Sequence, residues 1–448
     1  MFLFASDASL LSRDRSDRRA IIRQFPGELH EVSVNSSVLV WTADAFTAVE
    51  RGSHEITVQI RRPQIDREPI CELRWRPAEA AVICRRRWSG EFSAYVSEDH
   101  RREALGRPCA LITSHLKLAP LLLKRRPRVW KRIEPGQEAS VRGGRIRLKN
   151  KLCWSVPLKR DYGETVCEVR RLVLESVASI PSAAALLLSG GIDSSVVAAA
   201  SRLVNREVHA FTFGLDKRVR AQTDMESDLI CARRVAAHLK IPLSEILLDS
   251  RLLVRNLPLG IYLAETPRGT IVDDCVALVE VARRIAEAGY SQVLMGEAAD
   301  DLFGGFKFAL RYYRGPQLRA YYRAQLAHDL PNELAIIQNV FAWFGISVVQ
   351  PMWTSELLRI GYNLPLRFRL DRQRLMKQVL RDAFATDLPS EIVNRPKCVT
   401  RDSTQIRYVL EEEFGTGRER YRALFHIMMG QRARWPRKFL QQLKSSRT

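Results

Sequence analysis

The residues best suited to chemistry lie in a short segment near the middle of the 448-residue chain. An apolar run, Leu186–Leu188, leads into the segment Ser189–Ser195, which reads SGGIDSS, and a helical pattern follows. Where a buried strand turns into a helix, free backbone N–H groups and the helix dipole converge on one point and form an anion site. The two glycines let phosphate oxygens approach the backbone, and the serine hydroxyls can donate hydrogen bonds. The segment predicts a phosphate-binding loop.

The carboxylate of Asp193 is unexpected inside an anion site. A carboxylate beside phosphates usually binds Mg²⁺, so the loop predicts a nucleotide bound together with a metal ion. The segment lacks the Gly-Lys-Ser/Thr ending of a Walker loop, which excludes the common nucleotide-binding motif.

A second segment whose residues could take part in chemistry is Met295–Phe306. It reads MGEAADDLFGGF and contains Glu297 and Asp300. It follows another short apolar run, so it is predicted to leave the sheet where the first loop does. In a doubly wound parallel sheet both loops lie at the carboxyl edge of the strands, and ligands bind there.

The elements that must position these loops alternate between strands and helices, which predicts an α/β domain with a doubly wound parallel sheet. After residue 305 the pattern is mainly helical. We expect strands at 183–188, 208–213, 246–248 and 292–295, and helices at 166–178, 194–204, 227–239 and 276–288.

The first part of the chain has a different pattern. Residues 1–118 are β-rich, with the clearest alternation at Ile56, Val58 and Ile60. Residues 119–159 are basic and interrupted by Pro and Gly, so we expect a linker there. The α/β domain is expected to occupy 160–448.

Composition limits the function classes. Hydrophobic residues make up 46% of the chain, so it is globular, and no run is long and apolar enough to span a bilayer. The eight cysteines form no CxxC pair, which argues against a zinc or redox site. Scattered cysteines and the lack of a signal-like N-terminus predict a cytoplasmic protein. The net charge of +21 fits either a polyanionic partner or solvated basic faces, and we favour the latter, so nucleic acid is not the expected partner.

The two central loops together resemble the ATP pyrophosphatase loop and the acidic loop of the asparagine synthetase-like superfamily. Weaker matches are Pro135-Gly136, Trp88–Ser93 and Leu105–Arg107 at the N-terminal side, and Lys377–Arg381 and Asn394–Lys397 near the end. The superfamily includes asparagine synthetases, β-lactam synthetases and lasso-peptide cyclases. The resemblance implies cleavage of ATP between its α and β phosphates and transfer of AMP to a carboxyl oxygen.

The resemblance also implies roles for single residues. ATP and its pyrophosphate would be bound by Leu188, Ser189, Gly190, Gly191, Asp193, Ser194, Ser195, Phe213 and Gly296. Mg²⁺ would be bound by Asp193 and Asp300, and the catalytic side chains would be Glu297 and Lys397. A lysine and Mg²⁺ can offset the negative charge that develops during adenylation.

Three departures from the family narrow the function. Glutamine-using members begin with a nucleophilic Cys, whereas the first Cys here is Cys71, so residues 1–118 are expected to be a shortened glutaminase-like domain of the Ntn type without glutaminase activity. Asp273 and Asp274 replace an arginine-containing segment that serves free aspartate, and these acids could attract a cationic amine. The segment 345–354 has lost its charged residues, which fits a bulkier substrate or a drifted structural core.

These departures favour a lasso-peptide macrolactam cyclase. Such an enzyme adenylates an acidic side chain of a precursor peptide, whose own amine then closes the ring, with a leader-binding protein and a peptidase as expected partners. A β-lactam synthetase and an asparagine synthetase are the alternative enzymes, and a basic nucleotide- or nucleic-acid-binding protein is the alternative that is not an enzyme.

Overall fold

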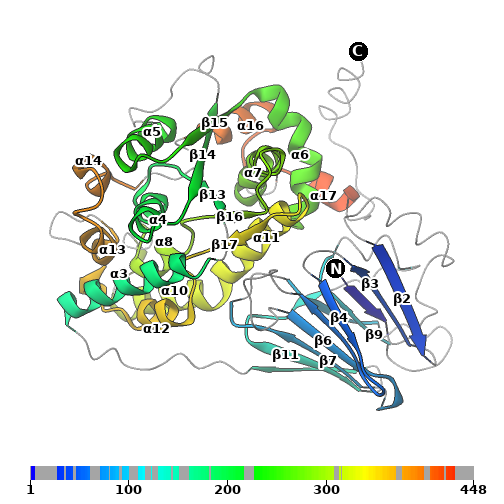
Figure 1. Ribbon diagram of the computed structural model, residues 1–448. Helices are drawn as coiled ribbons and strands as arrows, with labels where there is room; N and C mark the ends of the chain where they lie inside the picture. Colours follow the sequence, from blue (N-terminus) through cyan, green and yellow to red (C-terminus); the bar gives the residue numbers. More distant parts are fainter. Residues whose placement is uncertain are drawn as a thin grey trace.

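The computed structural model shows an N-terminal β-domain followed by an α/β domain (Figure 1). The residues that it describes are 2–5, 28–34, 37–43, 47–60, 71–79, 81–89, 93–99, 109–116, 123, 130–142, 145–150, 161–180, 183–215, 227–306, 312–313, 315–369, 376–397, 404–417 and 420–428.

The β-domain consists of two antiparallel sheets that pack face to face. The strand order in the first sheet is β10 (Lys131–Arg132), β8 (Tyr95–Asp99), β9 (Cys109–Thr113), β1 (Phe2–Ala5), β3 (Ser37–Ala43) and β2 (Glu28–Val34). The order in the second is β12 (Arg145–Asn150), β11 (Gln137–Arg142), β7 (Ala81–Arg86), β6 (Cys71–Arg76), β5 (Ile56–Ile60) and β4 (Thr47–Arg51). The core lies between the sheets, where the ring centroids of Phe4 and Trp75 are 5.6 Å apart.

The expectation of a linker at 119–159 is wrong for the central part of this range. β10, β11 and β12 all lie within it, and β11 pairs with β7 in the middle of a sheet. Ala139 and Val141 are buried, whereas Ser140 between them is half-buried and Arg142 is exposed, which is the period of a strand. Pro135 and Gly136, which suggested a connector, form a turn between β10 and β11. Leu105–Arg107 and residues 151–159 lie outside the described residues.

The α/β domain contains a parallel sheet, as expected. The strand order is β15 (Leu243–Leu248), β14 (Val208–Leu215), β13 (Ala184–Leu187), β16 (Gln292–Leu294) and β17 (Ser347–Val349), and every pairing is parallel. The order reverses direction between β13 and β16, the point at which doubly wound sheets bind ligands. β17 lies in the segment that departs from the family, and its three residues are buried.

Helices cover both faces of this sheet (Figure 1). One core cluster joins Leu186 and Leu294 to helices α3 (Tyr162–Ala178), α4 (Ile192–Leu203) and α5 (Asp228–Leu239). The other joins Ala185 and Val293 to α6 (Ser250–Ala264), α7 (Gly269–Glu287) and α11 (Leu330–Ala342). α6 was not among the expected helices, and Pro258, a residue type that usually ends a helix, lies inside it.

The remainder of the chain is mainly helical, which confirms the expectation for residues beyond 305. Its elements are α8 (Ala299–Phe303), α10 (Gly315–Ala324), the π-helical segment η3 (Gln325–Asp329), α12 (Ser355–Asn363), α13 (Gln378–Ala383), α14 (Ser390–Val393), α16 (Ile406–Phe414) and α17 (Arg422–Met428). None of the described helices has the length and apolar content that crossing a membrane requires.

A buried ion pair anchors the end of the described chain to α7. Arg420 donates to Asp273, and the Tyr421 hydroxyl donates to the other carboxylate oxygen at 2.8 Å. The side chains of Asp273 and Arg420 are 1% and 4% exposed. Because both charges are removed from water, each depends on the other. This anchor fixes the start of α7 against the segment that precedes α17.

We expect Asp273→Asn to lower the free energy of unfolding by about 3 kcal/mol, because it leaves the Arg420 charge buried without its carboxylate. Glu287→Gln is the matched control, since it breaks only an exposed pair with Arg284 on the same helix. Chemical denaturation of both variants measures the difference. Equal stability of the two would contradict a structural role for the Asp273 pair.

Candidate active site

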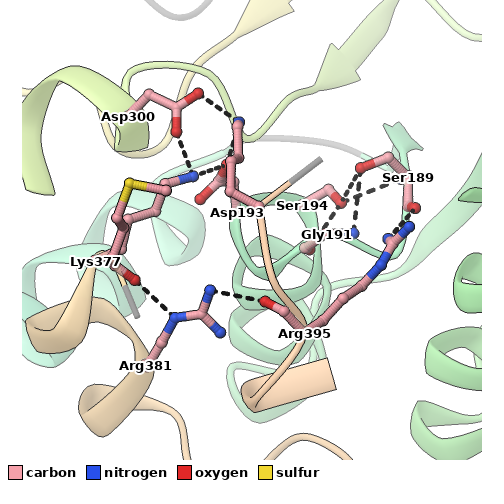
Figure 2. Close-up of polar contacts among 10 residues, drawn as sticks. Ser189, Gly191, Asp193, Ser194, Asp300, Lys377, Arg381 and Arg395 are labelled. Atoms are coloured by element: carbon pink, nitrogen blue, oxygen red, sulfur yellow. Dashed lines mark hydrogen bonds and ion pairs between the residues drawn. The ribbon is translucent and has the colours of Figure 1, made fainter. Parts of the chain in front are cut away.

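The loop after the central strand β13 is held by its own serines. The hydroxyl of Ser194 accepts from the Ser189 N–H at 3.1 Å and lies 3.1 Å from the Ser189 hydroxyl, which in turn accepts from the Gly191 N–H (Figure 2). Gly191 is the N-cap of α4, and no side chain caps the helix there. Ser189, Gly191, Asp193 and Ser194 line one cavity of about 640 Å³. The loop therefore presents an uncapped helix N-terminus to that cavity.

Two residues expected to bind phosphate do not line the cavity. Gly190 has a φ of +68°, which glycine adopts readily. A Cβ at this position would lie 2.4 Å from Cys231 of α5, so only glycine allows this close packing. Ser195 is fully buried, and its hydroxyl has no hydrogen-bond partner among the described residues. Both support the loop from behind.

The loop after β16 meets the first loop through a glycine. A Cβ on Gly296 would lie 2.6 Å from the Ser194 nitrogen, so only glycine lets the two loops touch. This contact brings Glu297 and Asp300 to the same cavity as Asp193. The sheet order and the glycine thus place the two loops side by side, as the sequence predicted.

Two lysines bridge the two aspartates, and Figure 2 shows Lys377 between Asp193 and Asp300. The Lys377 ammonium lies 2.5 Å from Asp193 Oδ2 and 2.5 Å from Asp300 Oδ1. The Lys397 ammonium lies 2.5 Å from Asp300 Oδ2 and 3.9 Å from Asp193 Oδ2. We call these four residues the charge cluster. The Lys377 side chain is 1% exposed, so its ion pairs lie away from bulk water.

Each charge in the cluster stabilises its neighbours. Burial works to raise the pKa of Asp300, but the ammonium groups of Lys377 and Lys397 overcome it and hold that pKa well below the ordinary value. Burial works to lower the pKa of Lys397, but the carboxylates of Asp300 and Asp193 raise it above the ordinary value. Asp300 and Lys397 are therefore both ionised at neutral pH.

Sequence reasoning assigned no role to three cations of the site. Lys377 has a φ of +65° immediately before α13, a left-handed conformation that no local pattern indicates. Arg395 donates to Asp228 at 2.9 Å, and Arg381 donates to the carbonyl oxygen of Arg395 at 3.0 Å. All three line the cavity. They lie within the two C-terminal segments noted for their resemblance to the family, which was the available signal.

The other side of the cavity is built from helices α7 and α11. α7 contributes Cys275 and Leu278, and α11 contributes Ile336 and Ile337. Acidic groups from both helices accompany these apolar side chains: Asp274 and Glu333. We call this side of the cavity the helical wall. It differs in chemistry from the cationic side around Lys377.

Asp274 lines the cavity, but Asp273 does not. The expectation that both acids attract a cationic amine is therefore wrong for Asp273, whose carboxylate is buried against Arg420 and Tyr421. Successive residues of a helix point about 100° apart, so one of the two faces the cavity and the other faces the core.

Glu297 lies between the two sides of the cavity. The Glu297 side chain is exposed to the cavity, but the protein around that cavity limits its solvation, which disfavours the charged form, and the neighbouring Asp300 carboxylate adds repulsion. Together these effects raise the pKa of Glu297 to about 7. A carboxyl group with this pKa can exchange a proton near neutral pH.

The remaining residues expected to contact ATP also line the cavity. Leu188, Phe213 and Gly296 are among its lining residues, and their roles toward adenosine stay predictions. No set of three or more acidic, histidine or cysteine side chains in the described ranges forms a metal site. Asp193 and Asp300, the expected magnesium ligands, both line the cavity.

We expect Lys377→Met to destabilise the protein by about 2 kcal/mol, because it leaves two half-buried carboxylates short of a cation. The pKa of Asp300 is lower in the folded protein than in the unfolded chain, so its carboxylate adds stability above about pH 4. The wild type should lose this stability as the pH falls below about 4, and the variant, which has less of it, should lose less. Urea unfolding across this pH range measures both. Lys149→Met, at an exposed lysine of β12, is the control. Parallel stability curves for wild type and Lys377→Met would contradict the pairing.

Comparison with known proteins agrees with this geometry. The family described as asparagine synthase matches residues 168–339 and 339–426. The carboxyethyl-arginine beta-lactam-synthase of Streptomyces clavuligerus is 31% identical over 255 residues, which cover 54% of this chain and 46% of that protein. The glutamine-hydrolyzing asparagine synthetase 1 of Lotus japonicus is 26% identical over 234 residues, which cover 47% of this chain and 38% of that protein.

The chain thus spans less than half the length of these curated relatives. Among solved structures, the NMN synthetase of Francisella tularensis aligns with a TM-score of 0.30 at 14% identity, over 64% of this chain and 93% of that chain, which is too weak to argue from. The family match covers more than half of the chain and includes both central loops and the charge cluster. The chain therefore belongs to the asparagine synthase family.

Proposed function

We propose that the chain is an ATP-dependent amide ligase that releases AMP and pyrophosphate. A substrate carboxylate oxygen forms a bond to the α-phosphorus of ATP, and the bond to pyrophosphate breaks. An amine then forms a C–N bond with the acyl carbon, and AMP leaves with the C–O electron pair. The observation that carries the proposal is the meeting of an uncapped helix N-terminus with Lys377 and Lys397 in one cavity.

The phosphate end of the cavity would bind ATP through groups already in place. The first-turn N–H groups of α4 and the hydroxyls of Ser189 and Ser194 can donate to phosphate oxygens. Lys377 and Lys397 would neutralise the charge that builds up as pyrophosphate leaves. Both ammonium groups are positioned by the two aspartates before any ligand enters, so little reorganisation is needed.

The residues present fit a Mg²⁺ ion that enters with ATP. Asp193 Oδ1 is buried with no hydrogen-bond partner in the part of the chain described here, and carboxylate oxygen is a preferred ligand of this ion. Asp193 and Asp300 would hold it, and phosphate oxygens and water would complete its shell. When bound, Mg²⁺ would supply positive charge beside the phosphates.

We propose further that the amine belongs to the substrate itself and approaches along the helical wall. Among the described residues, the cations that line the cavity lie in or next to α13 and α14: Lys377, Arg381, Arg395 and Lys397. Helices α7 and α11 instead contribute acidic and apolar side chains. A free amino acid would find no cation on that wall for its α-carboxylate. An ammonium group would be attracted by Asp274 and Glu333 instead.

A precursor peptide has the chemistry that this wall fits. Its N-terminal amine would close an isopeptide ring on an activated Asp or Glu side chain, as in a lasso-peptide macrolactam cyclase. A leader-binding protein and a peptidase are the partners we propose for delivering such a peptide. Enforced proximity of amine and acyl-adenylate replaces a bimolecular encounter.

The second candidate is closure of a β-lactam within a small molecule. The observation that favours it is the 31% identity to carboxyethyl-arginine beta-lactam-synthase. That reaction also uses an amine of the substrate itself. Asparagine formation from aspartate is the third candidate, and the acidic helical wall argues against it.

We expect ATP turnover to yield AMP and pyrophosphate, and a synthetic peptide with a free N-terminus and an internal Asp or Glu to lose one water. The assay mixes enzyme, ATP and Mg²⁺ with such peptides, with carboxyethyl-arginine, or with aspartate plus ammonia or glutamine, and reads nucleotide and product by mass spectrometry. ADP as product would reject the ligase. Asparagine or a β-lactam would reject the peptide substrate while keeping the ligase.

We expect the rate of amide formation to rise as the pH increases through about 7. Below that pH Glu297 is protonated, and above it the carboxylate can accept the proton that the attacking amine releases. Glu297→Gln should abolish the rise and slow the reaction about a hundredfold. Glu356→Gln, at an exposed position of α12, should keep the wild-type profile. An unchanged pH profile in Glu297→Gln would remove Glu297 as the proton acceptor.

A further inference from the structure

We propose that the β-domain positions helix α11, and through it the helical wall where the amine binds. This inference rests on the proposed function and gives the β-domain a role in the amide-forming step. Arg86 and His115 of the β-domain are the positioning residues, and they act through Asn332 and Asn339 of α11. α11 lies along the β-domain in Figure 1.

The first contact holds the start of α11. The Arg86 guanidinium, on β7, donates to Asn332 Oδ1 at 2.9 Å and to the Ile133 carbonyl oxygen at 2.9 Å, and reaches the Pro331 carbonyl oxygen at 3.5 Å. Arg86 is 1% exposed, and burial lowers its pKa to about 10. A buried guanidinium has few alternative positions, because each lost hydrogen bond leaves a charged donor unsatisfied.

The second contact holds the C-terminal half of α11. His115 Nε2 lies 3.1 Å from Asn339 Oδ1, and its Nδ1 lies 2.9 Å from the Ser114 hydroxyl. His115 and Asn339 are both buried, at 6% and 5% exposure. The ring is thus oriented from both nitrogens. Ala342, at the end of the helix, packs against the β-domain core.

These contacts lie beside the face of α11 that forms the helical wall. Asn332 and Asn339 are seven residues apart and share one side of the helix. Glu333, Ile336 and Ile337 occupy the adjacent side and line the cavity. A small rotation of α11 would therefore shift the wall. The phosphate end comes from other elements, the loops after β13 and β16 and the segments around α13 and α14, so it should not move with α11.

The variants Asn332→Ala and Asn339→Ala test the inference. Asn332→Asp keeps an acceptor for Arg86 and should keep the wild-type rate of ring closure. Asn363→Ala is the control, an asparagine at the end of α12 whose amide donates to the Arg359 carbonyl oxygen of the same helix at 2.8 Å. The adenylation step is followed by ATP–pyrophosphate exchange with an N-acetylated peptide, which cannot cyclise. Ring closure is followed with the free peptide, and hydrogen exchange of the α11 amides is measured without substrate.

We expect the two alanine variants to slow ring closure about tenfold or more, because small misplacements of reacting groups cost this much. Pyrophosphate exchange should stay within about twofold of wild type. Exchange of the α11 amides should rise, and Asn332→Asp should resemble wild type.

Unchanged α11 exchange would overturn the positioning role, as would equal losses in both reaction steps. If no peptide reacts with the wild-type enzyme, the proposed substrate fails, and the hydrogen exchange of α11 still decides whether the β-domain holds this helix.

Discussion

The charge cluster is the interaction on which the rest of the α/β domain depends. Asp193 comes from α4, Asp300 from α8, and the two lysines from the helical remainder of the chain. Removing these charges from water is tolerated only while each ammonium keeps a carboxylate at ion-pair distance. The cluster therefore fixes the late part of the chain over the carboxyl edge of the sheet. It also holds two cations where a phosphate chain would need them.

The central loops and four strands of the α/β domain could be predicted because their signals are local. A short apolar run followed by glycines and serines identifies the strand, the turn and the helix within about a dozen residues. The charge cluster could be predicted only in part. Lys377 pairs with Asp193 from 184 residues away, and its left-handed backbone has no signature in the neighbouring sequence. Pairing over such distances is decided by tertiary structure.

The same reasoning explains what was missed in the β-domain. Turn residues and basic side chains made 119–159 resemble a linker, although alternate residues such as Ala139 and Val141 enter the core. Arg86 is one of 71 basic residues, and nothing local distinguishes a buried guanidinium from a solvated one. Others pair on the surface, as Arg171 does with Glu168 and Glu175.

The cavity is built from two sides with separate anchors. The phosphate end is fixed by the charge cluster and by the glycine contact between the loops. The helical wall is fixed by the Asp273–Arg420 pair behind α7 and by Arg86 and His115 behind α11. Because these anchors share no residue, side chains on the wall can change without disturbing the groups that would activate the carboxylate. The two sides of the cavity can then vary independently of each other. In such an arrangement the β-domain contributes to the site by holding the helical wall in place.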